Sequence, residues 1–158
     1  MNPKIIVTYE SDAEERKIYR DLLEGLAQVH YLKDASKSNR SQLLNAADIV
    51  IALSFSQKEI DPAEISFLKN VRLIQLIYAG ADNIPFESIP AGILLASNAG
   101  AFARPIAEHA LALTLALAKN LLPKNELLQN GKFDRSGFNQ ELRGTVCGII
   151  GFGGGSAA

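Results

Sequence analysis

The chain of 158 residues has a net charge of −1, and 47% of its residues are apolar while 21% are charged. This length is enough for a domain with a real core, and the composition is that of an ordinary soluble globular protein. The small net charge gives no reason to expect nucleic acid or an anionic membrane as a partner. The longest apolar stretch, residues 110–118, is too short to cross a bilayer.

The first hundred residues alternate short apolar strands with helices. Strands are predicted at residues 4–9, 28–32, 48–53, 73–79 and 93–96, each a short and mostly continuous apolar run. Helical spacing predicts helices after Ser11 and over residues 41–47, and Pro90-Ala91-Gly92 predicts a turn before the last strand. This alternation indicates a doubly wound α/β domain with a five-stranded parallel sheet covered on both faces.

Two helix starts carry capping signals. Ser11 and Glu14 have the spacing of a capping box, in which each side chain accepts from the backbone N–H of the other residue. Asp61 is placed to cap a helix that has Pro62 in its first position and Glu64 in its first turn. We therefore expect one helix to follow each of these caps.

A long helix rich in alanine and leucine is predicted over residues 105–122. It is apolar on more than one face, so we expect it to be buried between two bodies. Residues 124–135 are polar and predict a short helix followed by an exposed arm. The predicted domains are residues 1–98, a bridging helix and arm over residues 99–143, and the start of a second domain over residues 144–158.

Residues 142–154 have the pattern of a buried strand that runs into a glycine turn, as at the start of a dinucleotide-binding βαβ unit. Cys147 stands in this apolar pattern. Reactive cysteines need exposure and nearby positive charge, so we expect a buried structural thiol. A single cysteine excludes an internal disulfide framework and favours a cytoplasmic protein. The sequence stops before a phosphate-binding helix, so we expect it to be the truncated front part of a larger enzyme.

Ligands of open α/β sheets bind at the carboxyl ends of the strands. Three segments follow such ends: Ser54-Phe55-Ser56, Tyr78-Ala79-Gly80-Ala81-Asp82-Asn83 and Ser97-Asn98-Ala99-Gly100. Gly80 has no side chain, so its backbone N–H can approach an anion closely, and a substrate carboxylate could be held there. The alternative is that Gly80 only permits a tight turn.

Four motifs occur in order at natural separations. They are Tyr78-Ala79-Gly80-Ala81-Asp82-Asn83-Ile84, Ser97-Asn98-Ala99-Gly100, Ile106-Ala107-Glu108-His109-Ala110-Leu111-Ala112-Leu113 and Gly148-Ile149-Ile150-Gly151-Phe152-Gly153-Gly154. Together they resemble the D-isomer-specific 2-hydroxyacid dehydrogenases, which include glycerate, phosphoglycerate and formate dehydrogenases. The resemblance implies a flavodoxin-like substrate domain, a Rossmann cofactor domain and a helical link between them.

The resemblance also implies binding residues. Ala79 and Gly80, after Tyr78, match a loop whose backbone amides hold the substrate carboxylate. Ser54 and Phe55 match a loop that lines the same pocket, and Asn98 matches a position facing the cleft beside the cofactor. The candidate substrate-binding residues are therefore Tyr78, Ala79, Gly80, Ser54, Phe55 and Asn98, and the candidate cofactor-binding residues are Gly151, Gly153 and Gly154.

No catalytic residue is assigned. The family's catalytic arginine, glutamate and histidine lie beyond the nucleotide fingerprint, and Glu108 and His109 match a mainly structural motif at the start of the bridging helix. The third fingerprint glycine is replaced by Ser156. The resemblance therefore implies NAD or NADP in the parent enzyme, with no cofactor bound by this chain alone and no metal.

Two functions remain open from the sequence. The first is the substrate-domain portion of an NAD(P)-dependent oxidoreductase that interconverts a small D-2-hydroxy acid and its 2-oxo acid, inactive on its own. The second is a non-enzymatic flavodoxin-like module that self-associates, as a homodimer or larger species, through the apolar helix at residues 103–122.

Overall fold

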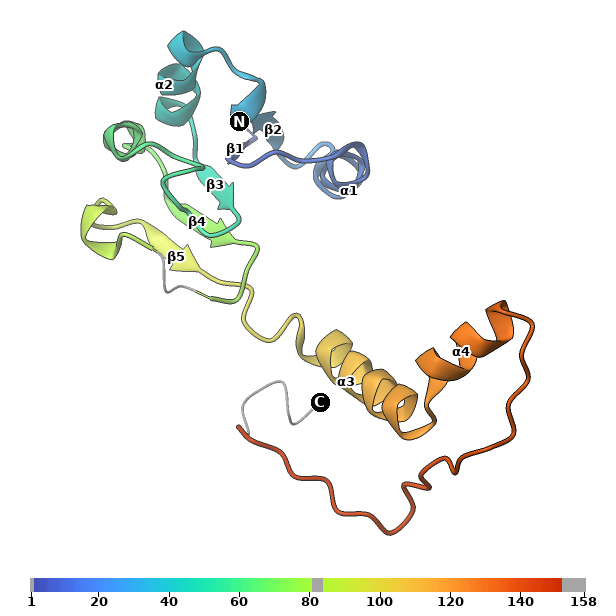
Figure 1. Ribbon diagram of the computed structural model, residues 1–158. Coiled ribbons are helices and arrows are strands. Elements are labelled where there is room, and N and C mark those ends of the chain that lie inside the picture. The colour runs from blue at the N-terminus through green and yellow to red at the C-terminus, as the bar shows by residue number, and fades with distance from the viewer. Residues whose placement is uncertain (1, 81–83, 152–158) are drawn as a thin grey trace. The chain divides into compact units, whose positions relative to one another are not determined.

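The computed structural model describes residues 2–80 and 84–151. It divides the chain into two units, one ending at Ala99 and the other beginning at Gly100. The first unit holds the sheet, and the second holds two helices followed by irregular chain (Figure 1).

The first unit is built on five parallel strands in the order β2-β1-β3-β4-β5. Their bounds are β1 Lys4–Val7, β2 Gln28–Tyr31, β3 Ile49–Ala52, β4 Leu73–Leu76 and β5 Leu94–Ala96. In register, Ile6 lies between His30 and Val50, and Val50 pairs with Ile74 on its other side. The predicted five-stranded parallel sheet is confirmed. The chain reverses its direction of winding between β1 and β3, which is the topological switch point of this sheet.

Alternate residues of the strands contribute to two hydrophobic cores, one on each face of the sheet. Val7 and Ile51 pack with Tyr19 and Leu23 of helix α1, Ala13–Leu23. The other face is covered by helix α2, Lys37–Asn45, and by the 3₁₀ segment η2, Pro62–Phe67. Its core is larger, with the following buried residues: Ile6, Leu32, Leu44, Ala47, Val50, Ala52, Phe55, Ile60, Ile65, Leu68, Val71, Ile74, Leu76 and Ile84. The sheet is therefore doubly wound, because successive strand residues point to opposite faces.

Two short connections complete this unit. The 3₁₀ segments η1, Leu32–Asp34, and η3, Phe86–Ser88, follow β2 and precede β5. The predicted turn before β5 is confirmed: the Ile93 N–H donates to the Pro90 carbonyl at 3.3 Å, and Gly92 has a φ of 94°. Only glycine adopts such a backbone without strain.

Of the two predicted helix caps, one is wrong and the other is confirmed. Helix α1 is capped by Asp12, whose carboxylate accepts from the Glu15 N–H at 2.8 Å, and not by Ser11. Ser11 is buried, and its hydroxyl has no hydrogen-bond partner among the described residues, so it does not cap the helix. The capping box of Asp61 and Glu64 is present, although the element that it starts is a 3₁₀ helix. Helix α2 begins at Lys37, four residues before the predicted start.

The second unit contains helix α3, Ala103–Ala118, and helix α4, Leu121–Gln129. A single helix over residues 105–122 was expected, but Asn120 adopts a left-handed φ of 51° and separates the two. The cause is Pro123, which has no N–H for the preceding turn and is tolerated only in the first turn of a helix. Helices α3 and α4 contact each other, and neither has a buried residue. The main chain of Gln140 also returns to the end of α3, where its N–H donates to the Ala118 carbonyl at 2.9 Å.

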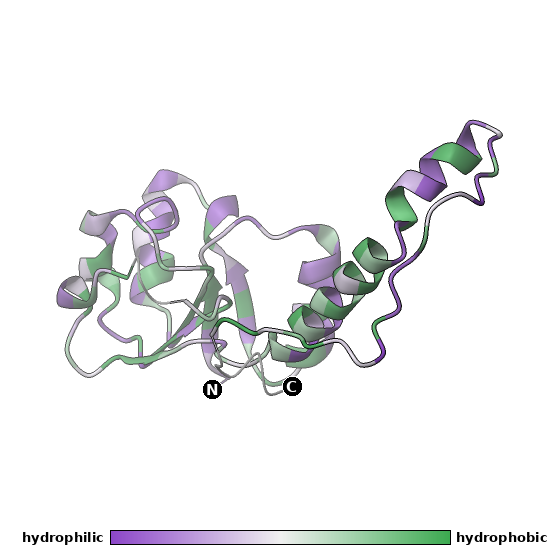
Figure 2. Cartoon of the chain, turned by 60° about the horizontal axis from the view of Figure 1, so that its bottom comes forward, coloured by the Kyte–Doolittle hydropathy of each residue, from purple (hydrophilic) through white to green (hydrophobic). Residues whose placement is uncertain are grey.

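The apolar character of α3 is evident along its length in Figure 2. The expectation that this helix is buried is not met, because none of its residues is buried and one neighbouring helix covers only part of its surface. Its exposed apolar side chains include Ile106, Leu111, Leu113, Leu115 and Leu117. Within the described residues, no helix is both long enough and apolar enough to cross a membrane.

The strand expected within residues 142–154 is absent from the part that the structure describes, up to residue 151. A strand is stable only when a neighbour takes up its backbone N–H and C=O groups, and none of the described residues pairs with this segment. Cys147 is consequently an exposed free thiol, which corrects the expectation of a buried one.

Candidate functional site at the carboxyl edge of the sheet

Three of the segments singled out in the sequence meet at the carboxyl edge of strands β3, β4 and β5. The Tyr78 N–H donates to the Leu53 carbonyl at 3.2 Å, and the Tyr78 carbonyl accepts from the Asn98 N–H at 3.2 Å. These bonds extend the β3–β4 and β4–β5 ladders by one or two residues past the strand ends. The structure therefore places Ser54, Tyr78 and Asn98 on three adjacent chain segments.

The middle segment is the most open. Tyr78, Ala79 and Gly80 are all exposed, while Asn98 beside them is half-buried. Backbone amides that lie at the carboxyl edge of a parallel sheet can hold an anion by hydrogen bonds. The exposed segment at this edge is therefore accessible to a small anion such as a carboxylate.

Phe55 takes a different place from its neighbours in the candidate set. Its ring is 2% exposed and belongs to the core beneath the sheet, and its φ of 53° is in the left-handed region. Ser54, the residue before it, is half-buried and is not part of that core. Phe55 thus contributes to the hydrophobic core and not to the exposed edge of the sheet.

Glu59 is the residue that sequence reasoning missed. Its carboxylate is buried behind the loop that follows β3, where it accepts hydrogen bonds from the Leu53 and Ser54 N–H groups at 2.9 and 3.0 Å. It also accepts from the Thr8 hydroxyl at 2.9 Å. A glutamate shortly after two serines at a strand end was the available signal. The partner on β1 could not be recognised from the sequence.

Other polar contacts anchor the helices of this unit. The Arg40 guanidinium contacts both carboxylate oxygens of Glu64, at 2.5 and 2.6 Å, and this pairing lowers the pKa of Glu64. Tyr9, at the end of β1, shares a hydrogen bond with Tyr19 at 2.6 Å and donates to Glu15. Burial and these contacts raise the pKa of Tyr9, so its phenol stays protonated and serves α1 as a structural anchor.

The candidate cofactor residues lie at and beyond the end of the described chain. Gly151 is exposed with a φ of 86°, and Gly153 and Gly154 fall outside the described residues. Residues 142–151 form neither the strand nor the helix start that holds a pyrophosphate, so they do not fit a dinucleotide on their own. In the part of the chain that the structure covers, no group of His, Cys, Asp and Glu side chains is arranged to hold a metal ion.

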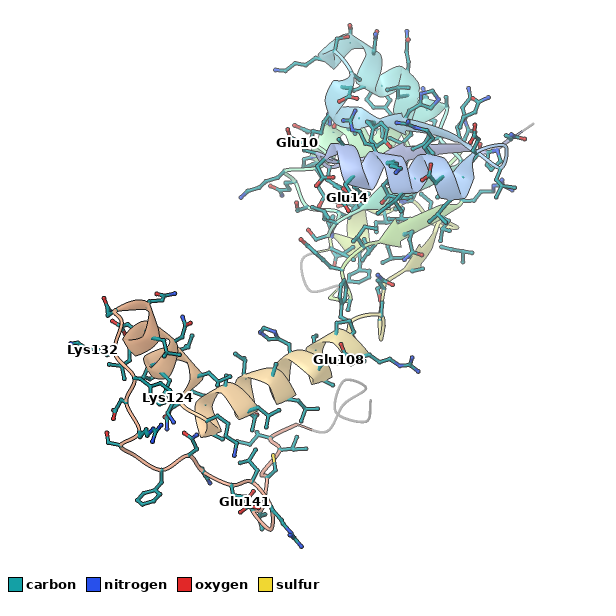
Figure 3. The ribbon with its side chains drawn as sticks, turned by 90° about the vertical axis from the view of Figure 1, so that its right-hand side faces the viewer. Glu10, Glu14, Glu108, Lys124, Lys132 and Glu141 are labelled. Atoms are coloured by element: carbon teal, nitrogen blue, oxygen red, sulfur yellow. The ribbon has the colours of Figure 1, made fainter. Side chains whose placement is uncertain are left out.

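Glu108 and His109 are exposed on α3, and Figure 3 labels Glu108 there. Neither side chain makes a hydrogen bond or ion pair among those found in the described part of the second unit. They stay unassigned.

Comparison with known proteins gives one consistent answer. The model of the family described as D-isomer specific 2-hydroxyacid dehydrogenase, catalytic domain, matches residues 5–151. A D-3-phosphoglycerate dehydrogenase of Archaeoglobus fulgidus is 35% identical over 100 residues, covering 62% of this chain and 19% of that protein. A glyoxylate reductase of Pyrococcus furiosus is 27% identical over 163 residues, covering 97% of this chain and 47% of its own length.

A solved structure shows the same fold. The D-isomer specific 2-hydroxyacid dehydrogenase from Lactobacillus delbrueckii ssp. bulgaricus, in an NAD-complexed form, superposes with a TM-score of 0.74 at 17% identity. The match covers 98% of this chain and 48% of that one. The chain therefore spans less than half the length of each of these relatives.

Proposed function

We propose that this chain, which belongs to the D-isomer specific 2-hydroxyacid dehydrogenase family, supplies the substrate-binding wall of an oxidoreductase. The enzyme would interconvert a small D-2-hydroxy acid and its 2-oxo acid. Residues 1–98 would be the substrate-binding domain, residues 99–143 a bridging helix and arm, and residues 144–158 the start of a dinucleotide-binding domain. The observation that best supports this proposal is that the Tyr78–Gly80 segment is exposed. Backbone hydrogen bonds also join it to the neighbouring segments at the same edge of the sheet.

In this proposal the substrate carboxylate is held by the backbone amides of Ala79 and Gly80. Ser54 and Asn98 flank that segment on the two adjacent chain segments. A carboxylate held in this way fixes the orientation of the neighbouring C2 atom, at which the oxidation state changes. The contribution of this unit is therefore positioning of the substrate, which is a large part of catalysis when reactants must meet in one geometry.

We further propose that the enzyme uses NAD or NADP and works in the cytoplasm. A relative was solved in an NAD-complexed form, and the exposed thiol of Cys147 suits a reducing compartment. Since residues 142–151 do not fit a dinucleotide by themselves, the chain alone should bind no cofactor and be inactive. Calorimetric titration of the chain with NADH should show no heat of binding, and micromolar binding would refute this part.

The substrate site can be tested by NMR on the labelled chain. D-lactate should shift the amide signals of Ala79 and Gly80, whereas neutral D-lactamide should not, because it lacks the carboxylate. Gly80→Val places a side chain against the amides and should abolish the shifts. Ala91→Val places the same side chain in the turn before β5, at the opposite end of the strands, and should leave the shifts unchanged. D-lactate that moves no amide of this segment would refute the proposed site.

One observation favours the second candidate, a module that self-associates. Ile106, Leu113 and Leu117 lie on one stripe of α3 and are 60%, 52% and 75% exposed. Exposed apolar patches of this kind mark contact surfaces. Sedimentation equilibrium should show a dimer or larger species that Leu113→Glu dissociates, while Gln129→Glu at the end of α4 does not. A monomer at all concentrations would remove this candidate.

A further inference from the structure

The Glu59 carboxylate is enclosed by hydrogen-bond donors of its own chain. Glu59 is a buried residue, and only 7% of its surface is exposed. One oxygen accepts from the Leu53 N–H and the Thr8 hydroxyl, both at 2.9 Å. The other accepts from the N–H and hydroxyl of Ser54, at 3.0 and 3.2 Å, and from the N–H and hydroxyl of Ser56, both at 3.4 Å. The Arg40 guanidinium donates to the main-chain carbonyl of Glu59 at 3.3 Å. The buried carboxylate itself is stabilised by the hydrogen-bond donors around it.

The arrangement calls for a hydrogen-bond acceptor at both oxygens of the Glu59 side chain. Each of the two oxygens accepts from a main-chain N–H, and a main-chain N–H cannot turn to become an acceptor. A glutamine at position 59 has nearly the same shape, but in either orientation its NH₂ group would face one of these N–H groups. Isosteric replacement therefore breaks the arrangement without opening a cavity.

The carboxylate also begins a series of backbone hydrogen bonds across the sheet edge. Leu53 donates to Glu59, the Leu53 carbonyl accepts from the Tyr78 N–H, and the Tyr78 carbonyl accepts from the Asn98 N–H. The Leu53 carbonyl belongs to the same planar peptide group as the Ser54 N–H, which also donates to Glu59, so Glu59 and Tyr78 bind opposite sides of one peptide group. The position of Glu59 thus bears on Tyr78 and Asn98, although it contacts neither of them.

The place that Glu59 occupies is itself informative. The Thr8 hydroxyl comes from the end of β1, and the other donors come from the loop after β3. These two strands flank the switch point, where open α/β sheets bind their ligands. The anion at this switch point is a side chain of the protein.

We propose that Glu59 is a positioning residue, which fills the switch point with an internal carboxylate and holds the Tyr78–Gly80 segment for the substrate. The second half of this statement rests on the proposed function. Because the Glu59 carboxylate occupies the ends of β1 and β3, the carboxylate of the substrate would bind instead at the exposed amides that follow β4.

The test compares Glu59→Gln with Glu14→Gln in the full chain. Glu14 is exposed at the start of α1 (Figure 3), so its replacement removes the same charge from the protein surface. Glu59→Gln should accelerate hydrogen exchange of the Tyr78 and Asn98 amides and raise the dissociation constant of D-lactate by about tenfold. Glu14→Gln should change neither quantity. Unchanged exchange at both amides in Glu59→Gln would overturn the proposal.

The two hypotheses fail in different ways. If the unmodified chain binds no D-lactate, the proposed function fails, while amide exchange still reports the positioning role. If D-lactate binds the unmodified chain and Glu59→Gln with equal affinity, the positioning role fails alone.

A second variant guards against misfolding. Glu59→Ala leaves the donors around an open space, and added acetate should restore the amide positions and stability that neutral acetamide does not. Acetate that has no greater effect on Glu59→Ala than acetamide would contradict the proposal, whether or not the variant folds unaided.

Discussion

Replacement of Phe55 should reverse the usual ranking of alanine and glycine. The ring is 2% exposed in the larger core, so Phe55→Ala should lower the free energy of unfolding by about 3–5 kcal/mol. The backbone φ of 53° adds a second effect. A left-handed conformation costs a residue with a Cβ about 1–2 kcal/mol, and glycine escapes this cost.

The size of the difference follows from two opposing effects. Glycine also gains freedom in the unfolded chain, which offsets about 0.4–1 kcal/mol of that relief. Phe55→Gly should therefore be more stable than Phe55→Ala by roughly 1 kcal/mol. Lys17 provides the control, because it lies inside α1 and is exposed. There the glycine variant should be less stable than the alanine variant by about 1 kcal/mol.

Urea unfolding followed by tyrosine fluorescence would measure both pairs. The chain has no tryptophan, and all four tyrosines, Tyr9, Tyr19, Tyr31 and Tyr78, lie in the first unit. The signal thus reports on the unit that contains both positions. A Phe55→Gly variant less stable than Phe55→Ala would show that the backbone strain assigned to this loop is wrong.

Three further predictions concern stability, pH and reactivity. Among the described residues the buried Ser11 hydroxyl has no partner, so Ser11→Ala should be neutral or stabilising in thermal melts, whereas Asp12→Ala should cost about 1 kcal/mol. Arg40 lowers the pKa of Glu64 in the folded chain. The ion pair therefore stabilises the fold at pH values above the pKa of Glu64 in the unfolded chain, and this stabilisation is lost as the pH falls through the pKa of Glu64 in the folded chain. Glu64→Gln should therefore weaken the dependence of the free energy of unfolding on pH in the acid range, and an unchanged dependence would contradict the pairing. Cys147 should react with a thiol reagent in native chain as fast as in urea, and protection would contradict its exposure.

The sheet could be predicted from sequence because each strand is a short apolar run of its own. A strand buried on both faces needs no information from distant residues to be recognised. The same reasoning failed over residues 142–151, where the apolar pattern is equally strong. A pattern specifies that a segment is suited to pairing, but pairing also needs a neighbour, and the described residues supply none.

The candidate site was predictable to the extent that it depends on strand ends. Parallel strands bring their carboxyl ends to one edge, so Ser54, Tyr78 and Asn98 could be expected near one another. Glu59 could not, because its importance depends on Thr8, which lies far away in the sequence and is brought close only by the β1–β3 pairing. Helix α1 is capped by Asp12 while Ser11 is buried, and the burial of Ser11 could not be predicted from the local spacing of residues.

The strand order also has a consequence for how the sheet assembles. Three of its ladders join strands that are close in sequence, such as Lys4 with Gln28 and Leu73 with Leu94. The ladder between β1 and β3 joins Ile5 to Ile49, a separation about twice as long, and closing a loop twice as long costs roughly 0.6 kcal/mol more. We therefore expect β2-β1 and β3-β4-β5 to form as two local halves that join last along the β1–β3 line. The hydrogen bond from Thr8 to Glu59 crosses that line, so it would be among the final contacts made during folding.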